Sequence, residues 1–314
     1  MIKTVRDAWQ IPELRRKILF TIFALLIFRL GAAIPVPYIN TSGLETYLSA
    51  QSGTILGLMN AMSGSAFSMA TLFALSIQPY INSSIIIQLL TVAIPALERL
   101  AKEGGEEGRK KIASITRYTT VAIGLIQGFG YYSLINSRGL VETEGLPAVW
   151  VAIVIILSFT AGSAFLMWLG EQITEFGIGN GISVLLFAGI VSRFPHMLRD
   201  MISGIQAYLN PRTEEQLAAM SEVERAAYEN SILAPWMIAV IVVGMLALVV
   251  LIVFISNSER RLPVQYAKRV VGRKMYGGQS THIPIKVNMG GVMPIIFAQS
   301  IAMIPATIGA FAGW

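Results

Sequence analysis

Few side chains in this sequence are of the types that perform catalysis, and they do not stand in a catalytic pattern. Among 314 residues the only histidines are His196 and His282, and the only aspartates are Asp7 and Asp200. The chain has no cysteine, so it offers no thiol nucleophile, disulfide or iron–sulfur cluster. We therefore expect a protein that is not an enzyme and that binds no cofactor or metal.

Two further patterns have only weak chemical interpretations. Gly272 and Gly277 have the spacing of a phosphate-binding loop, but Gly278 stands where that loop needs a lysine. Glu171 and Glu175 lie one helical turn apart near the end of an apolar run. As a proton-relay pair they would lack a basic or metal partner, so we interpret them as residues that solvate a helix end.

The composition indicates an all-α integral membrane protein. Apolar residues make up 54% of the chain and charged residues only 13%, whereas soluble domains have about 25% charged residues. The apolar runs are about 20 residues long, the length of a helix that crosses a bilayer. The net charge of +6 is the expected excess of Lys and Arg in cytoplasmic loops rather than a sign of nucleic-acid binding.

Seven apolar segments are predicted to span the membrane as a polytopic helical bundle. They are Ile18–Ile34, Ser68–Leu97, Tyr118–Ile135, Val149–Leu169, Ile182–Phe194, Met237–Ile255 and Val292–Gly313. Placing the N-terminus in the cytoplasm puts most Lys and Arg residues on that side, as the positive-inside rule requires. Arg29 lies near the external end of the first span, where a long side chain reaches the interface, so we interpret it as structural.

The stretch from Gly53 to Pro95 does not read as one clean helix. Its first part, Thr54–Phe67, is Met-rich and interrupted by glycine, and about 14 residues cannot cross a core that needs about 20. Its second part, Ser68–Leu97, is long enough but carries proline and several polar side chains. A half-span followed by a full span with polar side chains predicts irregular backbone in a protein-lined cavity, since lipid does not tolerate it.

Glycines indicate close packing and a tight turn. Gly124 and Gly128 form a small-xxx-small face on the third span, which lets helices approach closely. Gly177, Gly179 and Gly181 predict a tight cytoplasmic turn between the fourth and fifth spans.

Two segments outside the spans are long. The external segment Pro195–Pro235 contains a predicted surface helix, at residues 213–231, for which we find no function. The cytoplasmic segment Asn257–Asn288 is basic, and alternation around Leu262–Tyr266 predicts a short hairpin. It has about 30 residues where helix connections typically have about 2–8, which favours a docking site over a simple basic loop that contacts anionic lipid.

Aliphatic residues recur on one helix face at two places. Ile77 and Ile81 are spaced i, i+4, and so are Ile182 and Leu186 on the fifth span. The pattern alone favours ordinary helix packing.

Two runs resemble a known family. IQPYINSSIIIQLLTV (residues 77–92) is similar to the second span of SecY, the pore subunit of the bacterial Sec protein translocase, and MWLGEQITEFGIGNGIS (167–183) also matches that family. The resemblance implies a channel of ten spans in two inverted halves, of which this chain holds seven, lacking the last three. It divides the chain into a first half (1–194), an external loop (195–236) and the start of a second half (237–314) with a docking loop at 256–289.

The resemblance also implies roles for individual residues. The implied pore ring is Ile77, Ile81, Ile182, Leu186 and Ile296. The implied plug includes Thr54, Leu56, Leu58, Met59, Met62 and Phe67. The implied polar seam of a lateral gate is Asn82, Gln127 and Ser300, and the implied docking residues are Arg260, Arg261, Lys268 and Arg269.

The function that the resemblance implies is a protein-conducting channel of the cytoplasmic membrane. The implied partners are the SecE and SecG subunits, the SecA motor or the ribosome, signal sequences and the translocating polypeptide, with anionic lipid nearby. The alternative is a secondary transporter for a small solute, a class that also uses inverted repeats and broken helices. Aliphatic candidates at the midplane disfavour a charged solute.

Overall fold

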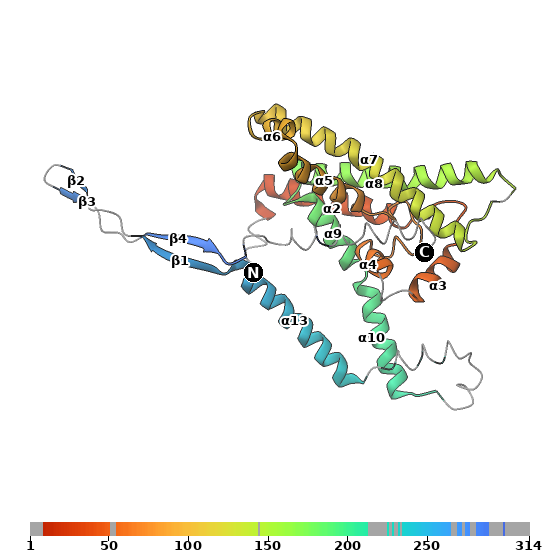
Figure 1. Ribbon diagram of the computed structural model, residues 1–314. Coiled ribbons are helices and arrows are strands. Elements are labelled where there is room, and N and C mark those ends of the chain that lie inside the picture. Colours follow the sequence, from red (N-terminus) through yellow and green to blue (C-terminus); the bar gives the residue numbers. More distant parts are fainter. Residues whose placement is uncertain are drawn as a thin grey trace. The chain divides into compact units, whose positions relative to one another are not determined.

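The computed structural model describes residues 9–50, 55–143, 145–212, 225, 228, 232, 234–264, 269–271, 274–276, 281–288 and 298. The chain falls into two compact units, Met1–Pro195 with Gln299–Trp314, and His196–Ala298. Figure 1 shows the helices and strands of both units.

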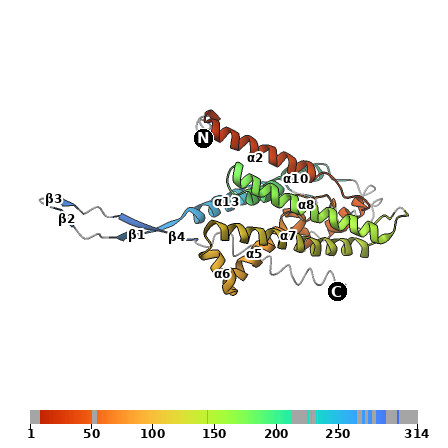
Figure 2. The same ribbon diagram turned by 90° about the horizontal axis from the view of Figure 1, so that it is seen from above.

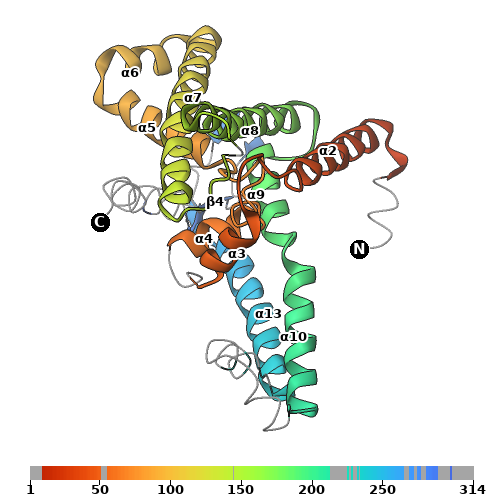
Figure 3. The ribbon, with the colours of Figure 1, turned by 90° about the vertical axis from the view of Figure 1, so that its right-hand side faces the viewer.

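The described part of the first unit is helical. Its helices are α2 (Pro12–Gly31), α3 (Thr41–Ala50), α4 (Ile55–Met62), α5 (Gln78–Ala93), α6 (Pro95–Lys102), α7 (Gly105–Ser137), α8 (Ala148–Phe176) and α9 (Gly181–Val191). α7 packs against α5 and α8, and α8 also contacts α2 and α9 (Figures 2 and 3). Phe159, Leu166 and Ile173 of α8 are 0% exposed, so α8 lies at the centre of this unit.

The predicted glycine face of the third span packs against α8. A Cβ atom on Gly124 would lie 3.2 Å from Oγ of Ser163, and one on Gly128 would lie 3.3 Å from the carbonyl oxygen of Ile156. Larger side chains at these positions would push α7 away from α8, so the predicted packing role is confirmed.

A proline bends the second predicted span. Ile94 has extended dihedral angles, φ −107° and ψ 113°, because a following proline disfavours the helical conformation in the residue before it. α5 therefore ends at Ala93, and α6 begins with Pro95 in its first turn. The two helix axes meet at 102°.

The prediction of one continuous span over Ser68–Leu97 is therefore wrong. α5 has only 16 residues, and residues 63–77 form successive turns instead of a helix. Ala70 and Ser76 have φ angles of +43° and +52°, in the left-handed region that a right-handed helix cannot contain. The predicted half-span before it corresponds to a short helix, α4, of 8 residues.

Three helical segments among the described residues are long and apolar enough to cross a membrane, or four if α5 and α6 form one bent span. The three are Ala148–Phe176, Gly181–Leu209 and Pro235–Asn257. The predicted spans Ile18–Ile34 and Tyr118–Ile135 lie largely within α2 and within α7. The last predicted span, Val292–Gly313, lies almost entirely outside the described residues.

The fifth predicted span, which is short for a membrane helix and is expected to extend at one end, continues beyond Phe194. Helix α10 (Phe194–Leu209) follows α9 along the chain, and the segment Gly181–Leu209 is long and apolar enough to cross a membrane. The external segment expected from Pro195 therefore begins as helix. The surface helix predicted at 213–231 lies almost entirely outside the described residues.

The second unit contains an apolar helix and a β-hairpin. None of the residues of α13 (Pro235–Asn257) is buried. Strand β1 (Glu259–Val264) pairs antiparallel with β4 (Thr281–Lys286), with Glu259 opposite Lys286. Between them β2 (Arg269–Val271) pairs with β3 (Lys274–Tyr276), so the predicted hairpin is confirmed (Figure 1).

Two clusters of buried side chains form the core of the first unit. The Phe67 cluster consists of Val36, Ile39, Leu44, Leu48, Phe67, Ala70, Ala74, Leu75, Tyr131, Ile135, Val151, Ile155 and Phe159. The Ile77 cluster consists of Ala24, Phe28, Ala32, Ala66, Phe73, Ile77, Leu166, Leu169, Ile173 and Leu185. Segment 63–77 contributes side chains to both, so it forms the boundary between them.

Candidate pore, plug and gate residues

Apart from Thr54, which is not described, the predicted plug residues lie on α4 and on the turn segment that follows it. Leu56 and Met59 of α4 are partly buried against the Phe67 cluster. The amide of Ser68 donates to Oδ1 of Asn60 at 3.0 Å, and the amide of Phe67 donates to Oγ of Ser63 at 3.0 Å. Side chains at the end of α4 therefore fix the first turns of segment 63–77.

The later part of segment 63–77 is bonded to the chain that follows α2. The amide of Val36 donates to the carbonyl of Ala70 at 3.0 Å, and the amide of Leu72 donates to the carbonyl of Ile34 at 2.9 Å. Such bonds are needed because a buried irregular backbone must satisfy its polar groups within the protein.

Four of the predicted pore-ring residues lie together. Ile77 is 1% exposed and belongs to the Ile77 cluster. Ile81, Ile182 and Leu186 are partly buried against the same cluster. Ile77 and Ile81 stand at the start of α5, whereas the other two lie on α9. The fold therefore gathers aliphatic side chains from two segments that are far apart in the sequence.

The end of α4 contacts the segments that carry these ring residues. Nε2 of Gln78, the residue after Ile77, lies 3.5 Å from Sδ of Met62. Gly64 has a φ angle of +67°, and a Cβ atom there would lie 2.6 Å from the carbonyl oxygen of Gly189 on α9. Only glycine combines this conformation with so close an approach, so α4 and α9 pack backbone to backbone at this point.

Two of the predicted gate residues carry unpaired buried oxygens. Oδ1 of Asn82 and Oε1 of Gln127 are buried and have no hydrogen-bond partner within the described part of the chain. Beside Asn82, the hydroxyl of Ser83 donates to the carbonyl of Thr116 at 2.8 Å and joins α5 to α7. Since an unpaired buried acceptor costs about 1–3 kcal/mol, the two side chains are suited to receive a donor from elsewhere.

Two of the predicted docking residues lie on the hairpin. Arg260 and Arg261 are exposed on β1, opposite Ile285 and Pro284 of β4. Other predicted residues fall outside the described side chains. Thr54, Lys268, Ile296 and Ser300 are not described, and Leu58 and Arg269 are described only as backbone of α4 and β2.

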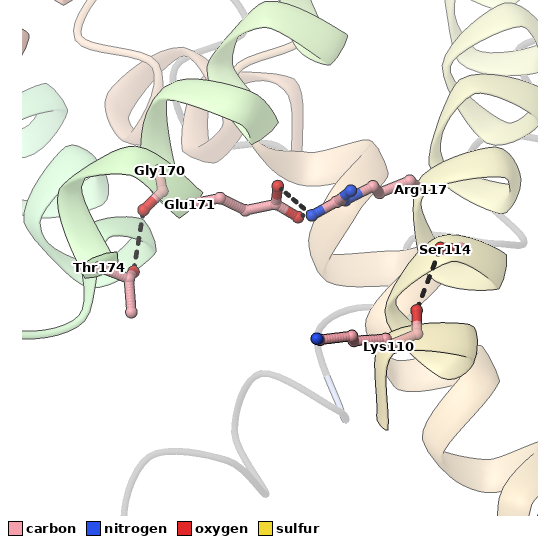
Figure 4. Close-up of polar contacts among 6 residues, drawn as sticks. All are labelled: Lys110, Ser114, Arg117, Gly170, Glu171 and Thr174. Atoms are coloured by element: carbon pink, nitrogen blue, oxygen red, sulfur yellow. Dashed lines mark hydrogen bonds and ion pairs between the residues drawn. The ribbon is translucent and has the colours of Figure 1, made fainter. Parts of the chain in front are cut away.

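Arg117 and Glu171 form an ion pair that sequence reasoning missed (Figure 4). Nε of Arg117, on α7, donates to Oε1 of Glu171, on α8, at 3.0 Å, and Nη2 lies 2.9 Å from Oε2. The interpretation of Glu171 as a carboxylate without a basic partner is therefore wrong. The signal was available, because antiparallel neighbouring spans bring the start of one beside the end of the next.

The fold is that of the protein-conducting channels. A solved structure of a protein-conducting channel has a TM-score of 0.57 and 18% identity, covering 98% of this chain and 62% of that one. Sec61 in the canine ribosome–channel complex from the endoplasmic reticulum has a TM-score of 0.57 and 17% identity, with 98% and 63% covered.

Sequence comparison defines the family. The SecY family matches residues 71–314. Protein translocase subunit SecY of Buchnera aphidicola subsp. Acyrthosiphon kondoi is 44% identical over 305 residues, which cover 96% of this chain and 78% of that protein. The same subunit of Escherichia coli K12 is 43% identical, with 96% and 63% covered. The chain belongs to the SecY family and spans between 63% and 78% of the length of these relatives.

Proposed function

We propose that this chain forms part of a channel that passes secretory polypeptides across the cytoplasmic membrane and releases signal and transmembrane segments sideways into lipid. The relatives are named as subunits of a protein translocase, which supports the proposal. The observation that carries it is the gathering of Ile77, Ile81, Ile182 and Leu186 around one cluster beside α4. The chain itself is not an enzyme in this proposal, and a partner supplies the energy.

The four aliphatic residues, with Ile296, form the pore ring. A polypeptide channel must pass varied side chains without leaking ions. A hydrophobic constriction excludes water and ions when it is empty, and branched aliphatic side chains can rotate to fit a chain that enters. Leu186 and the isoleucines are large enough for this and carry no polar atom that would hold water.

Residues 54–67, which include α4 and the first turns of segment 63–77, form the plug of the closed channel. The contacts of Met62 with Gln78 and of Gly64 with Gly189 support a plug that rests against the ring-bearing segments. Met59 and Met62 suit loose, reversible packing because the methionine side chain is flexible.

Asn82, Gln127 and Ser300 form the polar seam of the lateral gate. The unpaired oxygens of Asn82 and Gln127 support a donor on the seventh span. Hydrogen bonds between membrane helices contribute about 0.6–2 kcal/mol each, which is weak enough for an arriving signal sequence to displace.

The hairpin from β1 to β4 docks the SecA motor or the ribosome on the cytoplasmic side, where the N-terminus also lies. Arg260 and Arg261, which are exposed, and Lys268 and Arg269 are its basic contacts. SecE and SecG complete the membrane complex, and anionic lipid contacts the cytoplasmic basic residues.

A cysteine at Ile81 tests this function, because the chain has no other cysteine. We would place Ile81→Cys in the full-length polypeptide and stall a secretory precursor that carries one cysteine in mid-chain. Mild oxidation should then form a disulfide between the two. The matched control is Ile86→Cys on the same helix, whose side chain is 39% exposed and which should form none.

The outcomes separate the two classes of protein. A disulfide that forms at Ile81 only with a functional signal sequence supports a polypeptide path. If Ile81→Cys reacts with small thiol reagents but never with the precursor, the cavity admits solutes only. A secondary transporter would then replace the channel.

A further inference from the structure

Segment 63–77 is mostly buried, irregular and conformationally strained. Ser65, Ala70 and Ser76 have φ angles of +73°, +43° and +52°. Non-glycine residues adopt such angles only when the surrounding structure imposes them, and each costs on the order of 1–3 kcal/mol. Some contact from outside the segment must therefore hold it in place.

One tyrosine of α7 makes such a contact. The hydroxyl of Tyr131 donates a hydrogen bond to the carbonyl of Phe67. The rings of Tyr131 and Phe67 are stacked, with centroids 4.4 Å apart and planes inclined by 22°. The ring of Phe159 on α8 also packs against Tyr131, with the two ring centroids 5.0 Å apart.

We propose that Tyr131 is a positioning residue that tethers segment 63–77, and with it α4, in the closed position of the plug. The inference rests on the proposed function in that α4 is taken to be the plug. Tyr131 is 4% exposed and Phe67 is 2% exposed, so water cannot replace the bond while the segment stays in place.

The hydrogen bond from Tyr131 acts on the part of segment 63–77 that lies towards α4. Among the described residues, the amide of Phe67 donates to Ser63 within the same segment and not to α4 itself. The bonds from Ile34 and Val36 begin at Ala70, three residues further on. Tyr131 therefore holds the part of the segment that must move if α4 leaves its position.

Its place on α7 also couples the plug to the lateral gate. The same helix carries Gln127, one turn before Tyr131, with its unpaired buried oxygen. A displacement of α7 that changes the surroundings of Gln127 also moves the hydroxyl of Tyr131 away from Phe67. Opening of the gate thus weakens the tether of the plug without a separate signal.

Cysteine labelling in the reconstituted full-length channel tests the tether. Met59→Cys on α4 reports exposure of the plug, and Ala24→Cys on α2, 1% exposed, reports general loosening. Tyr131→Phe removes the hydroxyl and keeps the ring. Tyr132→Phe, at the neighbouring partly buried tyrosine, is the matched control.

The expected result is a roughly two- to tenfold faster maleimide reaction at Met59→Cys in Tyr131→Phe, the factor that one lost hydrogen bond gives. Tyr132→Phe should leave the rate unchanged, and Ala24→Cys should stay unreactive in both. In channels occupied by a stalled precursor the two tyrosine variants should react equally, because the plug is already displaced.

Two results would overturn the proposal. Equal rates at Met59→Cys in both tyrosine variants would mean that the hydroxyl does not hold the plug. A parallel rise at Ala24→Cys would mean that Tyr131 only stabilises the whole unit. The rate in the resting channel needs no translocation, so failure of the tether can be told apart from failure of the proposed function.

Discussion

The ring residues and the plug segment lie next to one another, but different interactions hold them. Ile81, Ile182 and Leu186 stand on α5 and α9, whose backbone hydrogen bonds are internal to each helix. Segment 63–77 has no regular structure and relies on bonds to Asn60, to residues 34–36 and to Tyr131. In the proposed channel, Ile81, Ile182 and Leu186 are therefore ring side chains on regular helices, whereas the plug is joined to a backbone that a few separate bonds hold in place.

In the proposed channel, this difference provides two separate barriers, the ring and the plug. Side chains of the ring can change rotamer around a passing chain while α5 and α9 stay in place. The plug can detach as a unit once a few bonds break, each with a net contribution of about 0.5–1.5 kcal/mol. On this proposal the ring adapts to a passing chain, and the plug is displaced.

The largest effect is expected where segment 63–77 meets α8. A Cβ atom on Gly162 would lie 1.9 Å from the carbonyl oxygen of Leu72, so Gly162→Ala must displace the segment. Overpacking of this kind costs about 1–3 kcal/mol, sometimes more, and should lower the melting temperature in detergent.

The control for Gly162 is Gly244 on α13. A Cβ atom at Gly244 meets nothing within 4 Å, and alanine is favoured over glycine within a helix by about 0.5–1 kcal/mol. Gly244→Ala should therefore leave the melting temperature unchanged or raise it. Equal losses in both variants would show that the contact with Leu72 is not what matters.

The next largest effect concerns the ring itself. Ile81→Ser places a hydroxyl among aliphatic side chains, and the constriction should then hold water and conduct ions when it is empty. We expect a several-fold rise in ion conductance of the resting channel in planar bilayers. Ile86→Ser on the exposed side of α5 should conduct like the unmodified channel, and a leak of equal size there would count against the ring.

A smaller effect is expected at the gate. Asn82→Leu removes the oxygen that we propose accepts a hydrogen bond from the seventh span, a bond that would contribute about 0.6–2 kcal/mol. Precursors with defective signal sequences should then be exported with altered efficiency, measured in an export assay. Unchanged export of such precursors would remove Asn82 from the polar seam.

The smallest effect is expected for the ion pair between α7 and α8. The side chains of Arg117 and Glu171 are 53% and 26% exposed, and exposed pairs contribute about 0.2–1 kcal/mol. Arg117→Gln should lower stability by no more than that, and less at high salt. Lys102→Gln, which removes a more exposed pair with Glu98, should have a still smaller effect, and the opposite order would contradict this ranking.

Long apolar runs and alternating strands could be predicted from the sequence. Val149–Leu169 lies within α8, Met237–Ile255 lies within α13, and the hairpin forms where alternation predicted it. These elements depend on local composition alone. The fold class followed from the same runs.

The turns of segment 63–77 could not be predicted in detail. Residues 68–77 are as apolar as a membrane helix. The close packing of Leu72 against Gly162 and the bonds to residues 34–36, which hold them in turns, involve residues distant in the sequence. The bend at Pro95 had a local signal, because a proline disfavours the helical conformation in the residue before it. The apolar composition of Ser68–Leu97 nevertheless favoured a single span. The pairing of Arg117 with Glu171 could have been predicted, because the two residues lie near the start and the end of consecutive spans.

The pore ring could not be predicted from residue spacing alone. The i, i+4 spacing of Ile77 with Ile81 and of Ile182 with Leu186 is shared by any helix that packs against a core. Only the fold brings the two pairs to one cluster, and their role as a ring remains a prediction.

The most direct test of the account joins the plug to the segment that carries the ring. Met62 and Gln78 are in contact, with Sδ and Nε2 3.5 Å apart, so in the variant with Met62→Cys and Gln78→Cys a short bis-methanethiosulfonate reagent should join the two thiols. The cross-linked full-length channel should fail to translocate a precursor, and a reductant that cleaves the cross-link should restore translocation. Complete cross-linking with undiminished translocation would contradict a plug that must leave the ring.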